Sequence, residues 1–210
     1  TYFEAVEKEY CELLKSYASA DEISKALFAV ETANMPLLGY GSKAFLLSLL
    51  ENAIEVSGGR LKADEVEKII KLGKELLQLP GKPMDGVEET LKVLRETGKY
   101  HLVVFTKGEL LDQENKFHRS GLKPYFDNII VVSDKTEASY YQLCERFSIN
   151  VEQLLMVGNS FRSDIEPVLK LGGWAAHIPF HTTWQHEVVE EYEHPHLLKL
   201  EYFAQLNQVL

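Results

Sequence analysis

The sequence predicts an α/β fold in which a helical domain precedes a parallel sheet. The first 80 residues contain only helical patterns, in which apolar residues recur at three- and four-residue steps. From residue 84 onward, short apolar runs alternate with amphipathic helices, which is typical of a parallel sheet covered by helices. A segment with two prolines and a glycine, residues 80–83, is typical of a linker. We therefore expect two domains, residues 1–80 and residues 81–210.

The N-terminal part predicts a bundle of helices. A second helix should begin near Asp21 and end before Pro36, because proline lacks the backbone N–H that continues a helix. The third, residues 43–56, is apolar on most of its circumference, which favours a central position in the bundle. Asp64 with Glu67 is the expected N-terminal cap of the fourth. The domain should therefore be all-α.

The C-terminal part predicts strands separated by helices. Apolar runs predict the strands, which lie at residues 101–105, 129–132, 154–157 and 174–178, and residues 197–200 are compatible with an edge strand. Asp85 with Glu88 should cap a helix that ends at Gly98, and Ser163 with Glu166 should cap the helix after the third strand. Another helix is expected at about residues 136–147.

Composition and charge exclude several classes of protein. The net charge of −10 argues against a nucleic-acid surface, which needs a basic face. The richest apolar run, residues 44–50, is far too short to span a bilayer, and residues 1–17 do not resemble a signal peptide. Cys11 and Cys144 lie among apolar neighbours, as reduced cysteines do. We expect a cytoplasmic protein that binds neither nucleic acid nor membranes, and the oligomeric state stays open.

Polar residues follow three of the predicted strands. Thr106 ends the first, Lys135 follows the second, and Asn159 and Asp164 follow the third. In open α/β sheets ligands bind at the carboxyl ends of the strands. A hydroxyl, a lysine and a carboxylate at this edge could hold a phosphate or carboxylate together with a divalent cation. Mg²⁺ prefers oxygen ligands, keeps several waters, and therefore needs only one or two carboxylates.

In these residues the chain resembles the haloacid dehalogenase superfamily of hydrolases. Residues 105–108 resemble its second motif, a strand ending in Ser or Thr that binds the transferring phosphoryl group. Lys135 resembles its third-motif lysine, and residues 158–164 resemble its fourth motif, which positions Mg²⁺. The helical domain resembles the α-helical cap inserted after the first motif. The resemblance therefore implies a Rossmann-like parallel sheet with an all-α helical-bundle cap.

The resemblance also implies roles for individual residues. It gives Thr106 and Lys135 catalytic roles and assigns phosphate binding to Thr106, Lys107, Gly108 and Lys135. Asp164 and Asn159 would hold Mg²⁺. The family usually has Asp at the position of Asn159, and the amide oxygen of Asn159 carries no charge, so Asp164 would be the main ligand. The implied activity is a Mg²⁺-dependent phosphatase that acts on a small phosphorylated metabolite through an aspartyl-phosphate.

The family's first motif, Asp-x-Asp-x-Thr at the end of a first strand, does not occur in this sequence. That motif carries the nucleophile and the general acid–base. By the resemblance, the strand that carries this motif would lie between the strand ending at Thr106 and the strand ending at Asn159. Without it, these two strands would be separated by a gap of about 10 Å, twice the usual spacing between strands. We expect the natural protein to have this strand before Thr1, and pairing of residues 102–105 with 154–157 would refute this. The rival hypothesis is that the segment was lost and something else fills the space.

Two further functions stay open. A dehalogenase needs no metal and is less compatible with the metal-type fourth motif around Asp164. A non-catalytic protein that kept the fold and an anion site is favoured by the missing first motif and by Asn159.

Overall fold

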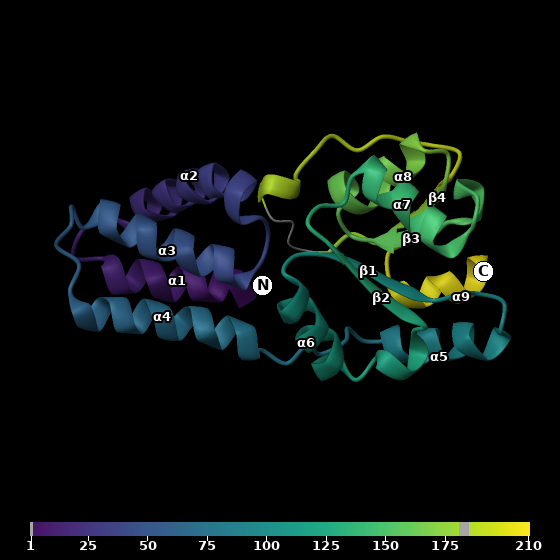
Figure 1. Cartoon of the computed structure of the whole chain (residues 1–210), viewed down its shortest axis with the longest axis horizontal. Helices are drawn as coiled ribbons and strands as arrows, with labels where there is room; N and C mark the ends of the chain where they lie inside the picture. Colours follow the sequence, from purple (N-terminus) through teal and green to yellow (C-terminus); the bar gives the residue numbers. More distant parts are fainter. Residues whose placement is uncertain (1, 181–184) are drawn as a thin grey trace. The chain divides into compact units, whose positions relative to one another are not determined.

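The computed structural model describes residues 2–180 and 185–210, which form two compact units (Figure 1). The first comprises Thr1–Gly81 with Gly108–Arg119, and the second comprises Lys82–Lys107 with Ser120–Leu210. The mixed α/β class with parallel sheets is as predicted. The sequence did not predict that residues 108–119 join the helical unit. The segment does so because the Ser42 hydroxyl donates to Asp112 across 2.9 Å and Arg119 donates to the Leu79 carbonyl across 3.0 Å.

The helices of the first unit bury one common core. They are α1 (Tyr2–Leu14), α2 (Ala20–Leu38), α3 (Ser42–Val56) and α4 (Ala63–Gln78). Tyr10, Leu27, Leu49 and Ile69 come from different helices, are at most 1% exposed, and belong to one hydrophobic cluster. Truncating side chains of this size to alanine typically costs about 2–5 kcal/mol. This shared core makes the helices a single bundle.

Helix α2 runs past Pro36, which corrects the prediction that it ends before this residue. Pro36 lies near the end of the helix, which continues to Leu38. A proline there removes one backbone hydrogen bond, and the next turn still closes because the Gly39 N–H donates to the Met35 carbonyl across 2.9 Å. Packing of the apolar face of α2 outweighs this local loss.

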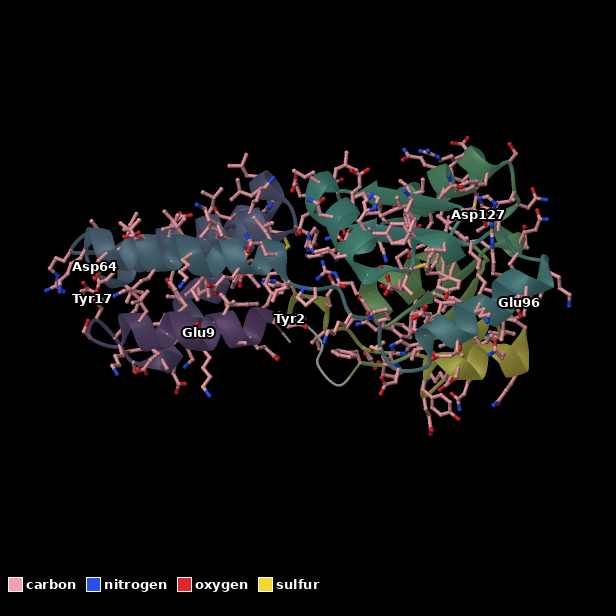
Figure 2. The ribbon with its side chains drawn as sticks, turned by 90° about the horizontal axis from the view of Figure 1, so that it is seen from below. Tyr2, Glu9, Tyr17, Asp64, Glu96 and Asp127 are labelled. Atoms are coloured by element: carbon pink, nitrogen blue, oxygen red, sulfur yellow. The ribbon has the colours of Figure 1, made fainter. Side chains whose placement is uncertain are left out.

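The start of α4 also differs from the prediction. Its cap is provided by Glu65 rather than Glu67, because the Glu65 carboxylate accepts from the Lys62 N–H across 2.9 Å. The Tyr17 hydroxyl donates to the same carboxylate across 2.7 Å. Figure 2 shows Tyr17 and Asp64 at the same end of the bundle. The acidic first turn of α4 is therefore anchored to the segment that follows α1.

The second unit contains two parallel sheets in the part of the chain that the structure describes. One pairs β1 (Val103–Lys107) with β2 (Asn128–Val132), and the other has the order β3 (Leu155–Gly158), β4 (Trp174–His177), β5 (Leu197–Lys199) (Figure 1). Phe105 lies opposite Ile130, and Val157 lies opposite Ala176. The edge strand compatible with residues 197–200 is present as β5.

Strands β1 and β3 belong to different sheets. Each has a single neighbouring strand within the described ranges, β2 for the first and β4 for the second. The pairing of residues 102–105 with 154–157, which would have refuted the hypothesis of a missing strand, is therefore not found there. Phe105, Tyr140, Val168 and Ala175 nevertheless share one hydrophobic cluster, which includes residues of both sheets.

Two helices of the C-terminal half, α5 (Val87–Thr97) and α7 (Glu137–Phe147), begin and end close to the predicted positions. The described residues of this half also form α6 (Leu110–Ser120), α8 (Glu166–Lys170) and α9 (Leu206–Val209). The cap of α5 is Gly86 rather than Asp85, whereas Gly98 ends the helix in the left-handed region as expected. Thr136 caps α7 by accepting from the Ser139 N–H. Every helix in the described ranges is too short or too polar to cross a membrane.

Candidate active site

The ends of three strands bring polar side chains together in the α/β unit. At the end of β1, Lys107 Nζ donates to Ser163 Oγ across 2.8 Å. After β2, Lys135 Nζ donates to Asp164 Oδ1 across 2.6 Å. Ser163 and Asp164 lie in η3 (Phe161–Ile165), a π-helical turn that follows β3. The carboxyl ends of β1, β2 and β3 therefore meet through side chains, although β1 and β3 belong to separate sheets.

The turn after β3 is organised by Ser160. Its hydroxyl accepts from the Ser163 N–H and its own N–H donates to Asp164 Oδ2, both across 3.0 Å. The predicted cap, Ser163 with Glu166, is therefore wrong, because the turn starts as a π-helix three residues earlier. Gly158 is required here, since a Cβ atom would lie only 2.2 Å from Asp164 Oδ2. The backbone of this turn thus fixes the orientation of the Asp164 carboxylate.

Lys135 and Asp164 form a buried ion pair. Their side chains are only 10% and 8% exposed. Lys135 Nζ also lies 5.6 Å from the centre of the Phe105 ring, a distance suited to a cation–π contact. The Tyr140 hydroxyl donates to the Ser163 carbonyl across 3.0 Å, and burial raises the pKa of Tyr140 so that it remains a donor. The lysine is thus held with its charge directed at the turn.

The other residues predicted for the site occupy less central positions. Thr106 is half-buried in β1 opposite Val131. Gly108 has φ of 140°, which favours glycine, and falls in the first compact unit. Asn159 is exposed, and its backbone carbonyl lies 3.1 Å from Nε2 of the buried His177. Of the residues predicted for the site, Lys135 and Asp164 are joined by a direct side-chain contact, and Lys107 contacts the same turn through Ser163.

A carboxylate that the sequence did not predict completes this cluster. Glu187 ends η4 (Gln185–Glu187) and is 8% exposed. It accepts hydrogen bonds from Lys107 and Ser160, and from Ser163 across 2.5 Å. Burial raises the pKa of Glu187, but these hydrogen bonds outweigh burial and hold it below its usual range. No periodicity or motif marked this glutamate in the sequence.

A divalent cation at this site would be held by Asp164 and Asn159. A carboxylate and an amide oxygen are ligands that Mg²⁺ accepts, and Mg²⁺ usually retains waters and substrate phosphate oxygens. The described residues contain no group of three or more His, Cys, Asp or Glu placed to hold a metal ion. The donor types present therefore suit Mg²⁺, whose remaining ligands would be water and substrate oxygens.

Comparisons of the sequence and of the structure with known proteins identify the same family of hydrolases. The family model described as haloacid dehalogenase-like hydrolase matches residues 2–172. The structure of a haloacid dehalogenase-like family hydrolase from Xanthomonas campestris is 34% identical, with a TM-score of 0.85 over 95% of this chain and 79% of that one. No curated protein sequence matches.

Two more distant structures share the fold alone. One, from Haemophilus somnus 129PT, is described as a predicted phosphoglycolate phosphatase and is 18% identical, with a TM-score of 0.60 over 97% of this chain and 89% of that one. The other, the putative HAD-hydrolase YfnB from Bacillus subtilis bound to magnesium, is 16% identical, with a TM-score of 0.60 over 99% of this chain and 92% of that one.

Proposed function

The chain belongs to the haloacid dehalogenase-like hydrolases, and we propose that it is a Mg²⁺-dependent phosphatase of a small phosphorylated metabolite. The observation that carries this proposal is the buried contact between Lys135 and Asp164 at the strand ends. A lysine fixed in a site of low dielectric is suited to stabilise the charge that develops on phosphoryl oxygens. The Asp164 carboxylate beside it is suited to bind the divalent cation that accompanies a phosphorylated substrate.

Phosphoryl transfer depends mainly on positioning and on charge stabilisation. In this proposal the Thr106 hydroxyl and the N–H groups of Lys107 and Gly108 donate to phosphoryl oxygens. Lys135 supplies a fixed positive charge, while Asp164 and Asn159 hold Mg²⁺. The ion, when bound, neutralises phosphate charge. Support for magnesium comes from the donor types and from the Bacillus subtilis hydrolase of the same fold, whose structure contains it.

We propose that a strand carrying an Asp-x-Asp segment, not contained in residues 1–210, lies between β1 and β3. Both strands have an edge without a strand partner in the described ranges. Each buried and unpaired backbone group costs about 1–3 kcal/mol, and one inserted parallel strand would satisfy both edges. Its carboxyl end would place the nucleophilic aspartate near Thr106 and Asp164. That aspartate would attack phosphorus and release the alcohol, and water would then hydrolyse the aspartyl-phosphate.

The test is hydrolysis of p-nitrophenyl phosphate by the full-length protein, with and without Mg²⁺. We expect turnover that EDTA abolishes, and a loss of about 100-fold or more in kcat for Lys135→Met and Asp164→Asn. Lys92→Met, at an exposed position of α5, is the matched control and should retain activity. Absence of turnover across a panel of phosphomonoesters would overturn the proposal.

The alternatives predict different results in the same assay. A dehalogenase would release halide from 2-haloacids and would not respond to EDTA. A non-catalytic anion-binding protein would bind inorganic phosphate without turnover. The absence of an Asp-x-Asp segment in residues 1–210 favours this last alternative, and a nucleophile-bearing strand in the full-length protein would argue against it.

We also propose a cytoplasmic protein whose partner is the small substrate rather than a nucleic acid or a membrane. Cys11 and Cys144 are buried free thiols, which suit a reducing compartment. The net charge of −10 opposes binding to polyanions.

A further inference from the structure

We infer that Glu187 is a positioning residue that ties the end of β1, with Thr106, to the turn that carries Asp164. The inference rests on the proposed function, because it gives Glu187 a role in assembling that same site. In this inference Glu187 acts by orienting other residues of the site and does not itself contact the substrate.

The contacts of Glu187 link two elements of the α/β unit. Its Oε1 atom accepts from Lys107 at the end of β1, and its Oε2 atom accepts from Ser160 and Ser163 around η3. Lys107 also donates directly to Ser163 across 2.8 Å. The Lys107 and Glu187 side chains are 16% and 9% exposed, so solvent screens this network little. One carboxylate thus connects the predicted phosphate-binding strand to the predicted metal-binding turn.

No backbone hydrogen bonds join β1 directly to β3 within the described ranges. β1 and β3 lie in different sheets, so the ladder that normally spaces adjacent strands is missing between them in the described ranges. The direct contacts between the end of β1 and the turn after β3 are therefore made by side chains, and the strand proposed to lie between the two sheets would add backbone pairing to them. Hydrogen bonds to a charged acceptor are roughly twice as strong as neutral ones, which suits Glu187 to this task.

The effect of Glu187 reaches Asp164 through Ser160. The only proton of the Ser160 hydroxyl is donated to Glu187, which leaves the oxygen oriented to accept from the Ser163 N–H across 3.0 Å. The Ser160 backbone N–H in turn donates to Asp164 Oδ2. Loss of the Glu187 carboxylate should therefore loosen the turn and widen the range of orientations open to Asp164.

Three donors hold the Glu187 carboxylate, from Lys107, Ser160 and Ser163, which suits a group that fixes the geometry of its neighbours. The same segment is also docked on η3 by a second contact, in which Arg162 donates to the His186 carbonyl. Glu190, an exposed carboxylate three residues further along the chain, makes no described contact with Lys107 or the two serines, which makes it a useful control.

The experiment compares Glu187→Gln, Glu187→Asp and Glu190→Gln in the full-length protein. Glutamine keeps the shape but cannot accept from all three donors, whereas aspartate keeps the charge. We expect Glu187→Gln to lower kcat and the apparent Mg²⁺ affinity by about 10- to 100-fold, with KM changed less than about 3-fold. Glu187→Asp should recover part of this loss, and Glu190→Gln should remain close to wild type.

Amide hydrogen exchange provides a readout that does not depend on activity. We expect exchange of a peptide covering residues 160–165 to rise at least about 10-fold in Glu187→Gln, with β4 unchanged. Unchanged exchange in this peptide, or unchanged kcat and Mg²⁺ affinity in an active enzyme, would overturn the inference. If Glu187→Gln does not fold, Ser163→Ala removes one donor and is expected to show the same changes more weakly. An inactive wild type whose variant shows faster exchange would refute the proposed function and leave the inference standing.

Discussion

Lys135 Nζ and Asp164 Oδ1 lie 2.6 Å apart, although the two residues are 29 positions apart in the sequence. The contact joins the loop after β2 to the turn after β3, and these strands belong to different sheets. Both side chains are largely buried. A buried charge without its partner is far less stable than the pair, so each residue depends on the other.

Removal of one partner should therefore destabilise the protein strongly. We expect Lys135→Met to lower the free energy of unfolding by about 3–5 kcal/mol, measured by urea denaturation, because the Asp164 charge is left unpaired. The double variant Lys135→Met/Asp164→Leu should recover much of that loss. The control is Lys170→Met, which breaks the more exposed pair with Glu166 and should cost less than about 1 kcal/mol. Equal effects at positions 135 and 170 would contradict the expectation.

Gly158→Ala should disturb the Asp164 carboxylate directly. An added methyl group would lie 2.2 Å from Asp164 Oδ2 and 2.5 Å from its Cβ, so the turn has to move. We expect a loss of about 1–3 kcal/mol in unfolding free energy, together with reduced phosphatase activity. Gly73→Ala in α4 is the comparison, because its methyl group would press on the Leu46 side chain, which can change rotamer without moving the backbone. A Gly158 variant as stable as the Gly73 variant would show that the turn tolerates the methyl group.

Elements with strong local signals could be predicted from the sequence. The strand at residues 129–132 and the helix at about 136–147 were predicted almost to the residue: an apolar run marks the strand, and Thr136 caps the helix in the structure at its expected start. The contact between Lys135 and Asp164 agrees with the general rule that polar residues after parallel strands meet at one edge. Such features depend on interactions that are close in sequence or imposed by topology.

Features that depend on distant packing could not be predicted. Pro36 remains within α2 because bundle packing outweighs a single lost hydrogen bond. Ser160 caps an uncommon π-helical turn, which apolar periodicity does not reveal. Glu187 lies in a segment without periodicity, and its partners Lys107 and Ser163 are 80 and 24 residues away. Only the folded chain brings these groups together.

The carboxyl group of Glu31 in the helical unit should make stability depend on pH. Burial and the nearby charge of Glu7 raise the pKa of Glu31 to about 7. The folded state therefore holds this proton more tightly than the unfolded state, whose glutamate titrates near its usual 4.5. Stability from this group is fully present below that value and is lost as the pH rises through about 7.

Replacement of Glu31 by glutamine tests this dependence. We expect Glu31→Gln to raise the free energy of unfolding by about 1–3 kcal/mol near pH 8 and to have little effect near pH 4.5, as measured by urea denaturation. Glu9→Gln, at an exposed position of α1 (Figure 2), is the control and should change stability at neither pH. A gain of the same size at both pH values would exclude titration of Glu31 as the cause.

The Tyr10 hydroxyl lies between two acceptors in the core of the helical bundle, and they share its single proton. It lies 2.7 Å from Asn52 Oδ1 and 2.8 Å from the Leu49 carbonyl, and Tyr10 is fully buried. Tyr10→Phe would leave both acceptors without this donor, so we expect a loss of about 1–3 kcal/mol in unfolding free energy. Tyr2→Phe, on the same helix but 52% exposed (Figure 2), should change stability by less than about 0.5 kcal/mol.

A second substitution separates the hydrogen bond from the packing of the ring. Asn52 Nδ2 is buried and has no hydrogen-bond partner within the described residues. In the Tyr10→Phe background, Asn52→Leu removes both this donor and the abandoned acceptor, so it should restore about 1 kcal/mol or more. If the double variant is instead less stable than Tyr10→Phe alone, the amide of Asn52 must stabilise the bundle through a contact other than the one with Tyr10.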